Sequence, residues 1–285
     1  MHIENACVEC IINQSLKVAH AIEADESLEQ KLLSNTQKLS KDFSFQLSPP
    51  EVASRVYEEM ATLAQREDLY AQQKEEATKQ ALSFVPALKQ HLKTSSNKLL
   101  DATKIAVAGN VIDLAAEVEF DLTEEIHSLF EREFAHNDFT LLQKQLKKAE
   151  KIVIIGDNTG EHIFDYLFVE TLQELYPKLS ISYFVRGTPI INDVTMKEAK
   201  EVGFDTLCNL VDSGVNTPGF AYTRATQKAQ ELFDNADLVI SKGMGNYECL
   251  SPSHRENIFF LLKVKCNVVA LSLKQEVGDI ICKRV

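Results

Sequence analysis

At 285 residues, of which 45% are hydrophobic and 25% charged, the chain has enough apolar material for one large or two ordinary folded domains. Its formal net charge of −12 argues against nonspecific binding to nucleic acid or to anionic membranes, because both require a basic surface. No apolar run approaches the roughly 18 residues that span a bilayer, and the start MHIENACVEC lacks the pattern of a signal peptide. We therefore expect a cytoplasmic protein.

The first half of the chain carries helical periodicity and no convincing strand. Ser48 followed by Pro49 and Pro50 is typical of a helix start. The predicted helices span residues 4–23, 26–40, 49–65, 68–92, 97–116, 121–134 and 138–148. We therefore expect an all-α domain over residues 1–148.

Residues 149–285 alternate between predicted strands and predicted helices. The predicted strands are 151–156, 179–186, 206–211, 237–241, 258–264 and 267–273, and the predicted helices are 160–176, 195–202 and 221–235. This alternation predicts a doubly wound, mostly parallel sheet. The expected fold class is α/β, in which the helical amino-terminal domain packs on an α/β/α sandwich.

Polar pairs follow the first two predicted strands at the point where each strand ends. Asp157 and Asn158 come directly after one strand, and Asn192 and Asp193 lie in the loop after the next. Ligand crevices form at the carboxyl ends of parallel strands, and oxygen ligands of this kind suit a hard divalent cation. Each pair could instead cap the helix that follows it. The recurrence of the pair in neighbouring loops favours one shared site, at which Asp157 and Asn158 offer oxygen ligands to a metal.

Two further strand ends carry residues that suit phosphate. Asp212 and Ser213 begin an Asp-Ser-Gly turn that offers another oxygen ligand or backbone N–H donors, although an ordinary turn explains it equally well. Lys242 and Gly243 follow the strand 237–241. A glycine lets the backbone approach a ligand closely, and a lysine supplies a point charge to a phosphoryl group. A surface turn with a solvated lysine is the alternative.

The helical half adds two candidate features. Asn110 and Asp113 are three residues apart and share a helix face, which we expect to look onto the crevice between the domains or to cap neighbouring helices. Cys7 and Cys10 have the spacing of half a zinc site or of a redox pair. No second pair with suitable spacing follows, so inert packing is the favoured interpretation.

Several short motifs follow one another over nearly the whole chain. They are CVEC at 7–10, PPE at 49–51, LYAQQK at 69–74, AGNVID at 108–113, GDNTGE at 156–161, RGTPIINDVT at 186–195, DSG at 212–214 and KGMGN at 242–246. Together they resemble the metal-dependent damage-control phosphatase family, and the early cysteine pair resembles its prokaryotic, stand-alone branch. The resemblance implies that a divalent metal (Mn, Co, Ni or Mg) binds Asp157, Asn158 and Asp193, and that Lys242 contacts phosphate.

The predicted function is therefore that of a metal-dependent phosphatase of small phosphorylated metabolites, such as sugar phosphates or damaged phosphometabolites. Asp157, Asp193 and Lys242 are the predicted catalytic residues. The residues assigned to substrate or phosphate binding are Asn110, Asp113, Arg186, Asn192, Asp212, Ser213, Gly243 and Asn246. A metal-bound water is the favoured nucleophile over the Asp157 carboxylate. The alternatives are a Rossmann-like transferase of the methyltransferase type, which the lack of a glycine-rich first loop disfavours, and a noncatalytic module that binds a phosphometabolite.

Overall fold

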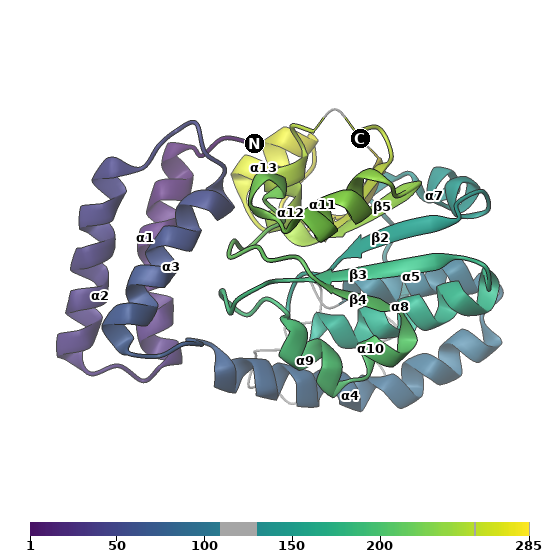
Figure 1. The fold of residues 1–285 in the computed structure, drawn as a ribbon, viewed down its shortest axis with the longest axis horizontal. Coiled ribbons are helices and arrows are strands. Elements are labelled where there is room, and N and C mark those ends of the chain that lie inside the picture. Colours follow the sequence, from purple (N-terminus) through teal and green to yellow (C-terminus); the bar gives the residue numbers. More distant parts are fainter. Residues whose placement is uncertain (109–129, 254, 285) are drawn as a thin grey trace.

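Three amino-terminal helices stand beside a larger body in which helices cover both faces of one sheet (Figure 1). A computed structural model gives this arrangement and describes residues 1–108, 130–253 and 255–284. The three helices are α1 (Asn5–Ala21), α2 (Glu26–Leu39) and α3 (Pro49–Ala64). The larger body contains α4 (Ala71–Thr94), α5 (Lys98–Ala108), α7 (Phe139–Leu146), α8 (Glu161–Leu175), α9 (Met196–Glu201), α10 (Phe204–Leu207), α11 (Gln227–Asp234), α12 (Gly243–Leu250) and α13 (Asn267–Leu273).

Helix α3 shows how the local sequence determines where a helix begins, and its core shows how the three amino-terminal helices contact the larger body. It begins at Pro49, whose fixed φ suits a first helical turn, and Glu51 reaches back to accept a 3.0 Å hydrogen bond from the backbone N–H of Ser48. The apolar faces of α1, α2 and α3 form a core of their own, which Ile190 and Val268 of the larger body join. Buried apolar contacts therefore tie the three helices to the sheet.

Within the part of the chain that the structure describes, seven strands form one sheet in the order β1-β7-β6-β5-β2-β3-β4. They are β1 (His136–Asn137), β2 (Lys151–Ile155), β3 (Ser180–Val185), β4 (Asn209–Asp212), β5 (Leu238–Lys242), β6 (Ile258–Lys263) and β7 (Ile280–Arg284). All neighbours run parallel except β6 and β7. Because β2 lies between β5 and β3, the carboxyl ends of these three strands meet at one edge of the sheet.

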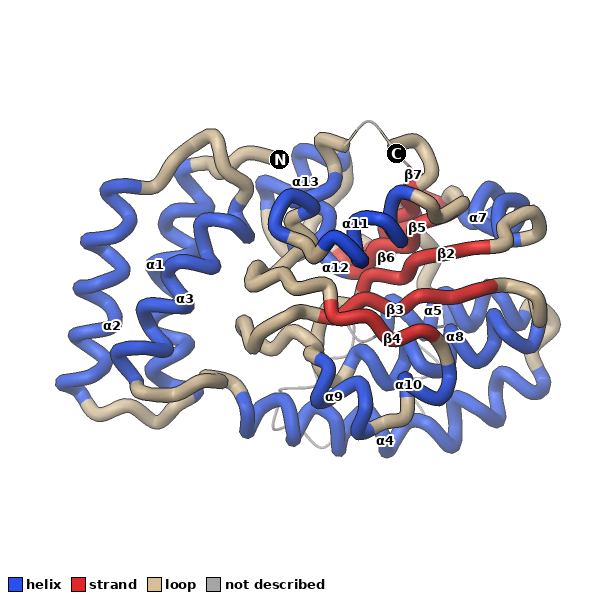
Figure 2. The backbone as a smooth tube through the Cα atoms, in the orientation of Figure 1, coloured by secondary structure: helices blue, strands red, loops and turns tan. Residues whose placement is uncertain are grey.

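Helices cover both faces of the sheet (Figure 2), and each face carries an apolar core of its own. Ile152 and Ile154 of β2 pack with apolar residues of α4, α5 and α8 on one face. Val153 and Ile155 pack with residues of α11, α12 and α13 on the other, as the alternation of side chains along a strand requires. The predicted fold class is confirmed: the protein has a helical amino-terminal region and a mostly parallel, two-sided α/β sandwich.

The segment 267–273 is a helix, α13, so the strand predicted there is wrong. The Sγ atom of Cys266 accepts a 3.5 Å hydrogen bond from the backbone N–H of Val269 at the helix start. Periodicity does not separate a buried helix from a buried strand in so short an apolar run. The final strand β7 and helix α12 were not predicted, and β1 lies inside the region expected to be all-α.

Helices α4 and α5 pack with the sheet, although Gln73 at the start of α4 also donates to the carbonyl of Ala21 in α1 at 2.9 Å. Phe84 of α4 and Ala102 of α5 are buried in the same core as Ile152. The predicted division of the chain into domains at residue 148 stays a prediction, but this packing groups residues 71–108 with the sheet.

We expect Phe164→Ala to lower the free energy of unfolding by about 3–5 kcal/mol, because the substitution leaves a cavity in the larger core. Phe164 of α8 is fully buried and meets Phe84 of α4 edge-on, with ring centroids 6.2 Å apart. Urea denaturation measures the change. Leu271→Ala, at a side chain that is 78% exposed, is the control and should stay within about 0.5 kcal/mol of the wild type. A loss below about 1 kcal/mol for Phe164→Ala would contradict the packing.

Candidate active site

The candidate site lies at the edge where β2, β3 and β5 end. Asp157 and Asn158 directly follow β2, and Asp193 lies in the loop between β3 and α9. The backbone N–H of Val194 donates to the carbonyl of Asp157 at 2.9 Å, and an isolated antiparallel bridge joins Asn158 to Asp193. The two Asn-Asp loops, 36 residues apart in sequence as 193 − 157, are therefore joined backbone to backbone.

One guanidinium serves both aspartates of the site. Arg186 is 1% exposed, and its Nε donates to Asp193 Oδ2 at 2.7 Å. Its Nη2 lies 3.9 Å from Asp157 Oδ1 and donates to Asn246 Oδ1 at 3.2 Å. Arg186 therefore holds Asp193 by a hydrogen bond and lies near Asp157, but it balances the charge of only one of them.

The carboxyl groups of the site are buried with too little positive charge to balance them. Burial raises the pKa of Asp193 to about 7, although Arg186 opposes the rise. Burial also raises the pKa of Asp157, and it raises the pKa of Glu161 to about 7 with help from the Asp157 charge. A divalent cation would neutralise this surplus negative charge.

Gly243, the first residue of α12, lies directly against the Asp157 carboxylate. Its φ is +76°, and a Cβ at this position would overlap the carboxylate atoms of Asp157. A side chain here would displace Asp157, so this position requires glycine for both backbone and space. The predicted role of Gly243 as a phosphate donor stays a prediction.

The side-chain donors of the site suit a hard divalent cation. The Nδ2 of Asn158 donates to Asp157 Oδ2 at 3.1 Å and to Glu161 Oε1 at 2.9 Å, which leaves its carbonyl oxygen without a hydrogen-bond partner among the described residues. No group of three or more His, Cys, Asp or Glu side chains in the described part of the chain is arranged to hold a metal. Two carboxylates with the carboxamide of Asn158 as third ligand nevertheless fit Mg²⁺ or Mn²⁺ in donor type.

The site opens into a cavity of about 730 Å³ between α1, α3 and the strand ends, which we call the crevice. Asp157, Asn158, Asn192 and Asp193 line it from the side of the sheet. From the other side α1 contributes Cys7, Cys10, Gln14 and Lys17, and the β6–α13 connection contributes Lys265 and Cys266. The cysteines are free thiols. The helical wall and the strand ends therefore enclose one space large enough for a small metabolite.

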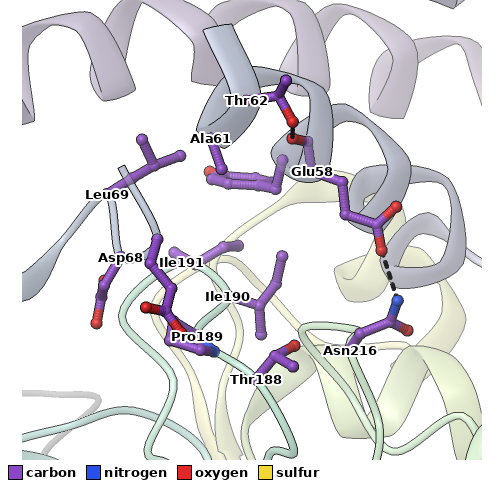
Figure 3. Close-up of a pocket in the computed structure, with 12 residues that line it drawn as sticks. Glu58, Ala61, Thr62, Asp68, Leu69, Thr188, Pro189, Ile190, Ile191 and Asn216 are labelled. Carbon is purple, nitrogen blue, oxygen red and sulfur yellow. Dashed lines mark hydrogen bonds between the residues drawn. The ribbon is translucent and has the colours of Figure 1, made fainter. Parts of the chain in front are cut away.

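A second cavity of about 380 Å³ adjoins the crevice (Figure 3). Ile190 and Ile191 of the loop after β3 face Glu58 and Ala61 of α3 across it, and Ile191 also lines the crevice. The Nδ2 of Asn216 donates to Glu58 Oε1 at 2.6 Å at its rim. This cavity extends the space between the helices and the sheet away from the aspartates.

Comparison with known proteins assigns the chain to a family. Residues 3–281 match the damage-control phosphatase ARMT1-like domain. The chain belongs to the damage-control phosphatase family. The N-terminal pair at Cys7 and Cys10 is consistent with the resemblance to its prokaryotic branch. Among the described residues, no helix combines the length and apolar character that crossing a bilayer requires.

Similar proteins match the chain over its full length. Damage-control phosphatase PH1575 of Pyrococcus horikoshii is 30% identical over 100% of this chain and 98% of its own length. A damage-control phosphatase of Archaeoglobus fulgidus is 28% identical, with 100% of both chains covered. The crystal structure of PH1575, described as a DUF89 family protein, has a TM-score of 0.93 at 29% identity and covers 100% of this chain and 99% of that one. The similarity therefore includes both the helical region and the sheet.

The damage-control motif KGMGN places its lysine away from the crevice. Lys242 is fully buried, and its Nζ donates to Asp165 Oδ1 at 2.6 Å. The other oxygen of Asp165 accepts from the hydroxyl of Tyr183 at 2.8 Å. Burial lowers the pKa of Lys242, but the Asp165 and Glu161 carboxylates outweigh that effect and the net shift is upward. The predicted phosphate contact of Lys242 stays a prediction, while the observed role is an ion pair between β5 and α8.

Asn246 of the same motif is buried, and its side-chain amide makes several hydrogen bonds. Its Nδ2 donates to the carbonyls of Gly156 at 3.0 Å and Lys242 at 2.6 Å. Its Oδ1 accepts from Arg186 and, at 2.7 Å, from the backbone N–H of Phe220. The amide thus joins the ends of β2 and β5 to the guanidinium, and its predicted contact with substrate stays a prediction.

The remaining predicted residues do not meet at the crevice in the described part of the chain. Asp212 is exposed and accepts a 2.8 Å hydrogen bond from the backbone N–H of Gly214, as in the ordinary turn weighed above. The buried hydroxyl of Ser213 donates to a backbone carbonyl of β3 at 2.5 Å. Asn110 and Asp113 lie outside the described residues.

Four charged residues of the site escaped the sequence-based prediction. Glu161 lies one helical turn after Asn158, a spacing that could have indicated it. Glu248 lines the crevice, and burial raises its pKa to about 7. Lys265 follows the predicted strand 258–264, so the strand-end pattern that marked the other candidates could have indicated it. Asp165 comes close to the site only through tertiary structure.

We expect Lys242→Met to destabilise the protein by about 3–5 kcal/mol, because it leaves the Asp165 carboxylate buried without its cation. The double variant Lys242→Met, Asp165→Asn should recover a large part of this loss, since the amide can still accept from Tyr183. Urea denaturation of the single and double variants measures the coupling. If the single variant were as stable as the wild type, the ion pair would not support the fold.

We expect metal-free protein to lose stability as the pH rises from about 4 to about 7. Asp193 has a folded pKa of about 7 against an ordinary value of 3.8, so the folded state retains a proton that the unfolded state releases over this range. Asp193→Asn should make the decline shallower by up to about 1.4 kcal/mol per pH unit. Urea denaturation at a series of pH values, with chelator present, compares the two slopes. Equal slopes would show that Asp193 does not titrate in this way.

Proposed function

We propose that this protein is a metal-dependent phosphatase of small phosphorylated metabolites. Its family supports a phosphatase that acts on damaged metabolites. The observation that carries the metal dependence is the buried pair Asp157 and Asp193, which share one guanidinium and lie beside Asn158 at the crevice. Sugar phosphates and damaged phosphometabolites are the proposed substrates, because a cavity of about 730 Å³ holds molecules of that size.

Asp157, Asn158 and Asp193 would hold the divalent cation, for which Mn, Co, Ni and Mg are the candidates. When bound, the cation supplies Lewis-acid neutralisation of phosphoryl oxygen charge and lowers the pKa of a coordinated water. The chain itself keeps the ligands in place: Arg186 orients both carboxylates, and Gly243 provides the space that Asp157 occupies. A carboxylate that coordinates the metal, such as Asp157, would be poorly placed to attack phosphorus, so water is the proposed nucleophile.

The chain also offers donors to the anionic group of a substrate. The Nη1 of Arg186 is buried and has no hydrogen-bond partner among the described residues. Helix α8 begins at Glu161, three residues after Asn158, so the positive end of its dipole lies at the same edge of the sheet. These groups would orient a phosphoryl group against the aspartates. The phosphatase family favours this function over the transferase and binding-module alternatives.

We expect metal-stripped protein to release no phosphate from an aryl phosphate or sugar phosphate until Mg²⁺, Mn²⁺, Co²⁺ or Ni²⁺ is added. Asp157→Asn should lower the metal-supported kcat/KM at least about 100-fold, because it removes a charged ligand. Release of inorganic phosphate is the measurement. Asp205→Asn, at an exposed position of α10, is the matched control and should retain full activity. Full activity of the stripped protein with chelator present would rule out metal dependence.

A further inference from the structure

Two thiols of α1 reach the crevice on one face of the helix. Cys7 and Cys10 are three residues apart, so they share a face, and both line the crevice. Cys7 is buried in the core of the three amino-terminal helices, whereas Cys10 is exposed and accepts a 3.9 Å hydrogen bond from the amide of Gln14. Packing therefore accounts for Cys7, but it leaves Cys10 open to small molecules that enter the crevice.

A third thiol comes to the same wall from the end of β6. Cys266 is half-buried, lines the crevice and packs against the helical core that contains Cys7. Burial raises the pKa of Cys266, and the charge of Cys10 adds to the rise. Burial likewise raises the pKa of Cys7, and the charge of Cys266 adds to it. Because the effect of a charge on a pKa falls off with distance, the three residues are neighbours, and we call them the thiol cluster.

The thiol cluster has no part in the proposed phosphatase reaction. All three cysteines are free thiols, and within residues 1–108, 130–253 and 255–284 no group of three or more His, Cys, Asp or Glu side chains is placed to hold a metal. Accessible neighbouring thiols can instead be oxidised to a disulfide. Cys10 of α1 and Cys266 of the β6–α13 connection are the more accessible members of the cluster, and they belong to different elements.

We propose that Cys10 and Cys266 form a reversible disulfide that closes the crevice when the cell contains hydrogen peroxide. The Cys10 thiolate attacks one peroxide oxygen, the O–O bond breaks, and Cys10 becomes a sulfenic acid while the other oxygen leaves as water. The Cys266 sulfur then attacks the sulfenic sulfur, and the displaced hydroxide leaves as a second water with the proton of the Cys266 thiol. Two thiols are oxidised and one peroxide is reduced. A cellular dithiol reverses the step by thiol–disulfide exchange.

The position of the disulfide explains how it would act on the site. A disulfide holds its two Cβ atoms about 3.8 Å apart, so the bond fixes α1 against the β6–α13 connection. That connection is tied to the first turn of α12, because the backbone N–H of Lys265 donates to the Sδ of Met244 at 3.1 Å. The same turn contains Gly243, which lies against the Asp157 carboxylate. Oxidation would therefore narrow the crevice beside the aspartates. This regulation deepens the proposed phosphatase function and rests on it.

The test exposes wild-type protein to hydrogen peroxide, removes the peroxide and then measures both the covalent state and the activity. Alkylation of the remaining thiols followed by mass spectrometry of unreduced peptides identifies any linked pair. Hydrolysis of a sugar phosphate with added Mn²⁺ gives kcat/KM before oxidation, after oxidation and after treatment with dithiothreitol. Cys10→Ser and Cys266→Ser remove the proposed bond. The matched controls are Cys7→Ala and, outside the crevice, Cys208→Ala. Circular dichroism checks that every variant is folded.

We expect oxidised wild-type protein to contain a Cys10–Cys266 linked peptide and to lose at least about tenfold in kcat/KM, because a displacement of about 1 Å near a reacting centre already costs a large factor in rate. Dithiothreitol should restore the activity. Cys7→Ala and Cys208→Ala should respond as the wild type does, whereas Cys10→Ser and Cys266→Ser should keep their activity through the peroxide treatment.

Three outcomes would overturn the switch. They are the absence of a linked peptide, a link between Cys7 and Cys10 in place of the proposed one, and inactivation of Cys266→Ser to the same extent as the wild type. A wild type that forms the Cys10–Cys266 bond, but hydrolyses no phosphate ester even when reduced, would overturn the proposed function and leave the disulfide in place.

Discussion

The structure of the site depends on two buried carboxylates that share one buried guanidinium. Asp157 and Asp193 come from neighbouring loops, and Arg186 contacts both. Burial alone would keep such groups protonated, and one cation balances only one of the two charges. The remaining charge explains why a divalent cation fits here, and Gly243 leaves the room that the Asp157 carboxylate occupies. The proposed metal binding rests on this imbalance.

The family motifs divide between the crevice and its support. Asp157, Asn158 and Asp193 line the cavity, while Lys242 and Asn246 lie behind it, where all their contacts are with the protein. Such support holds the strand ends in register and keeps the guanidinium aimed at the aspartates. The buried contacts of these motif residues give them a role in stability, whatever they contact in the substrate. Helix α1 forms the opposite wall of the crevice, apart from the charged centre at the strand ends.

The parts of the fold and site that sequence could predict are those that depend on local order. The alternation of strands and helices predicted the sheet. Because parallel strands end at one edge, the sequence also predicted that Asp157 and Asp193 lie close together. Segment 267–273 was assigned wrongly because a short apolar run carries no decisive period and the cap at Cys266 was not recognised. The pairing of Lys242 with Asp165 joins residues 77 positions apart, so no local pattern could predict it.

The most direct test of the metal centre is a titration of metal-stripped protein with Mn²⁺, followed by the electron paramagnetic resonance signal of the free ion. Wild-type protein should take up a single Mn²⁺ per chain, and Asp193→Asn should lose most of that binding while remaining folded. Loss of the bound ion in this variant would place the cation on the carboxylates that Arg186 orients. Unchanged uptake by Asp193→Asn, or no uptake by the wild type, would contradict a metal centre built on these residues.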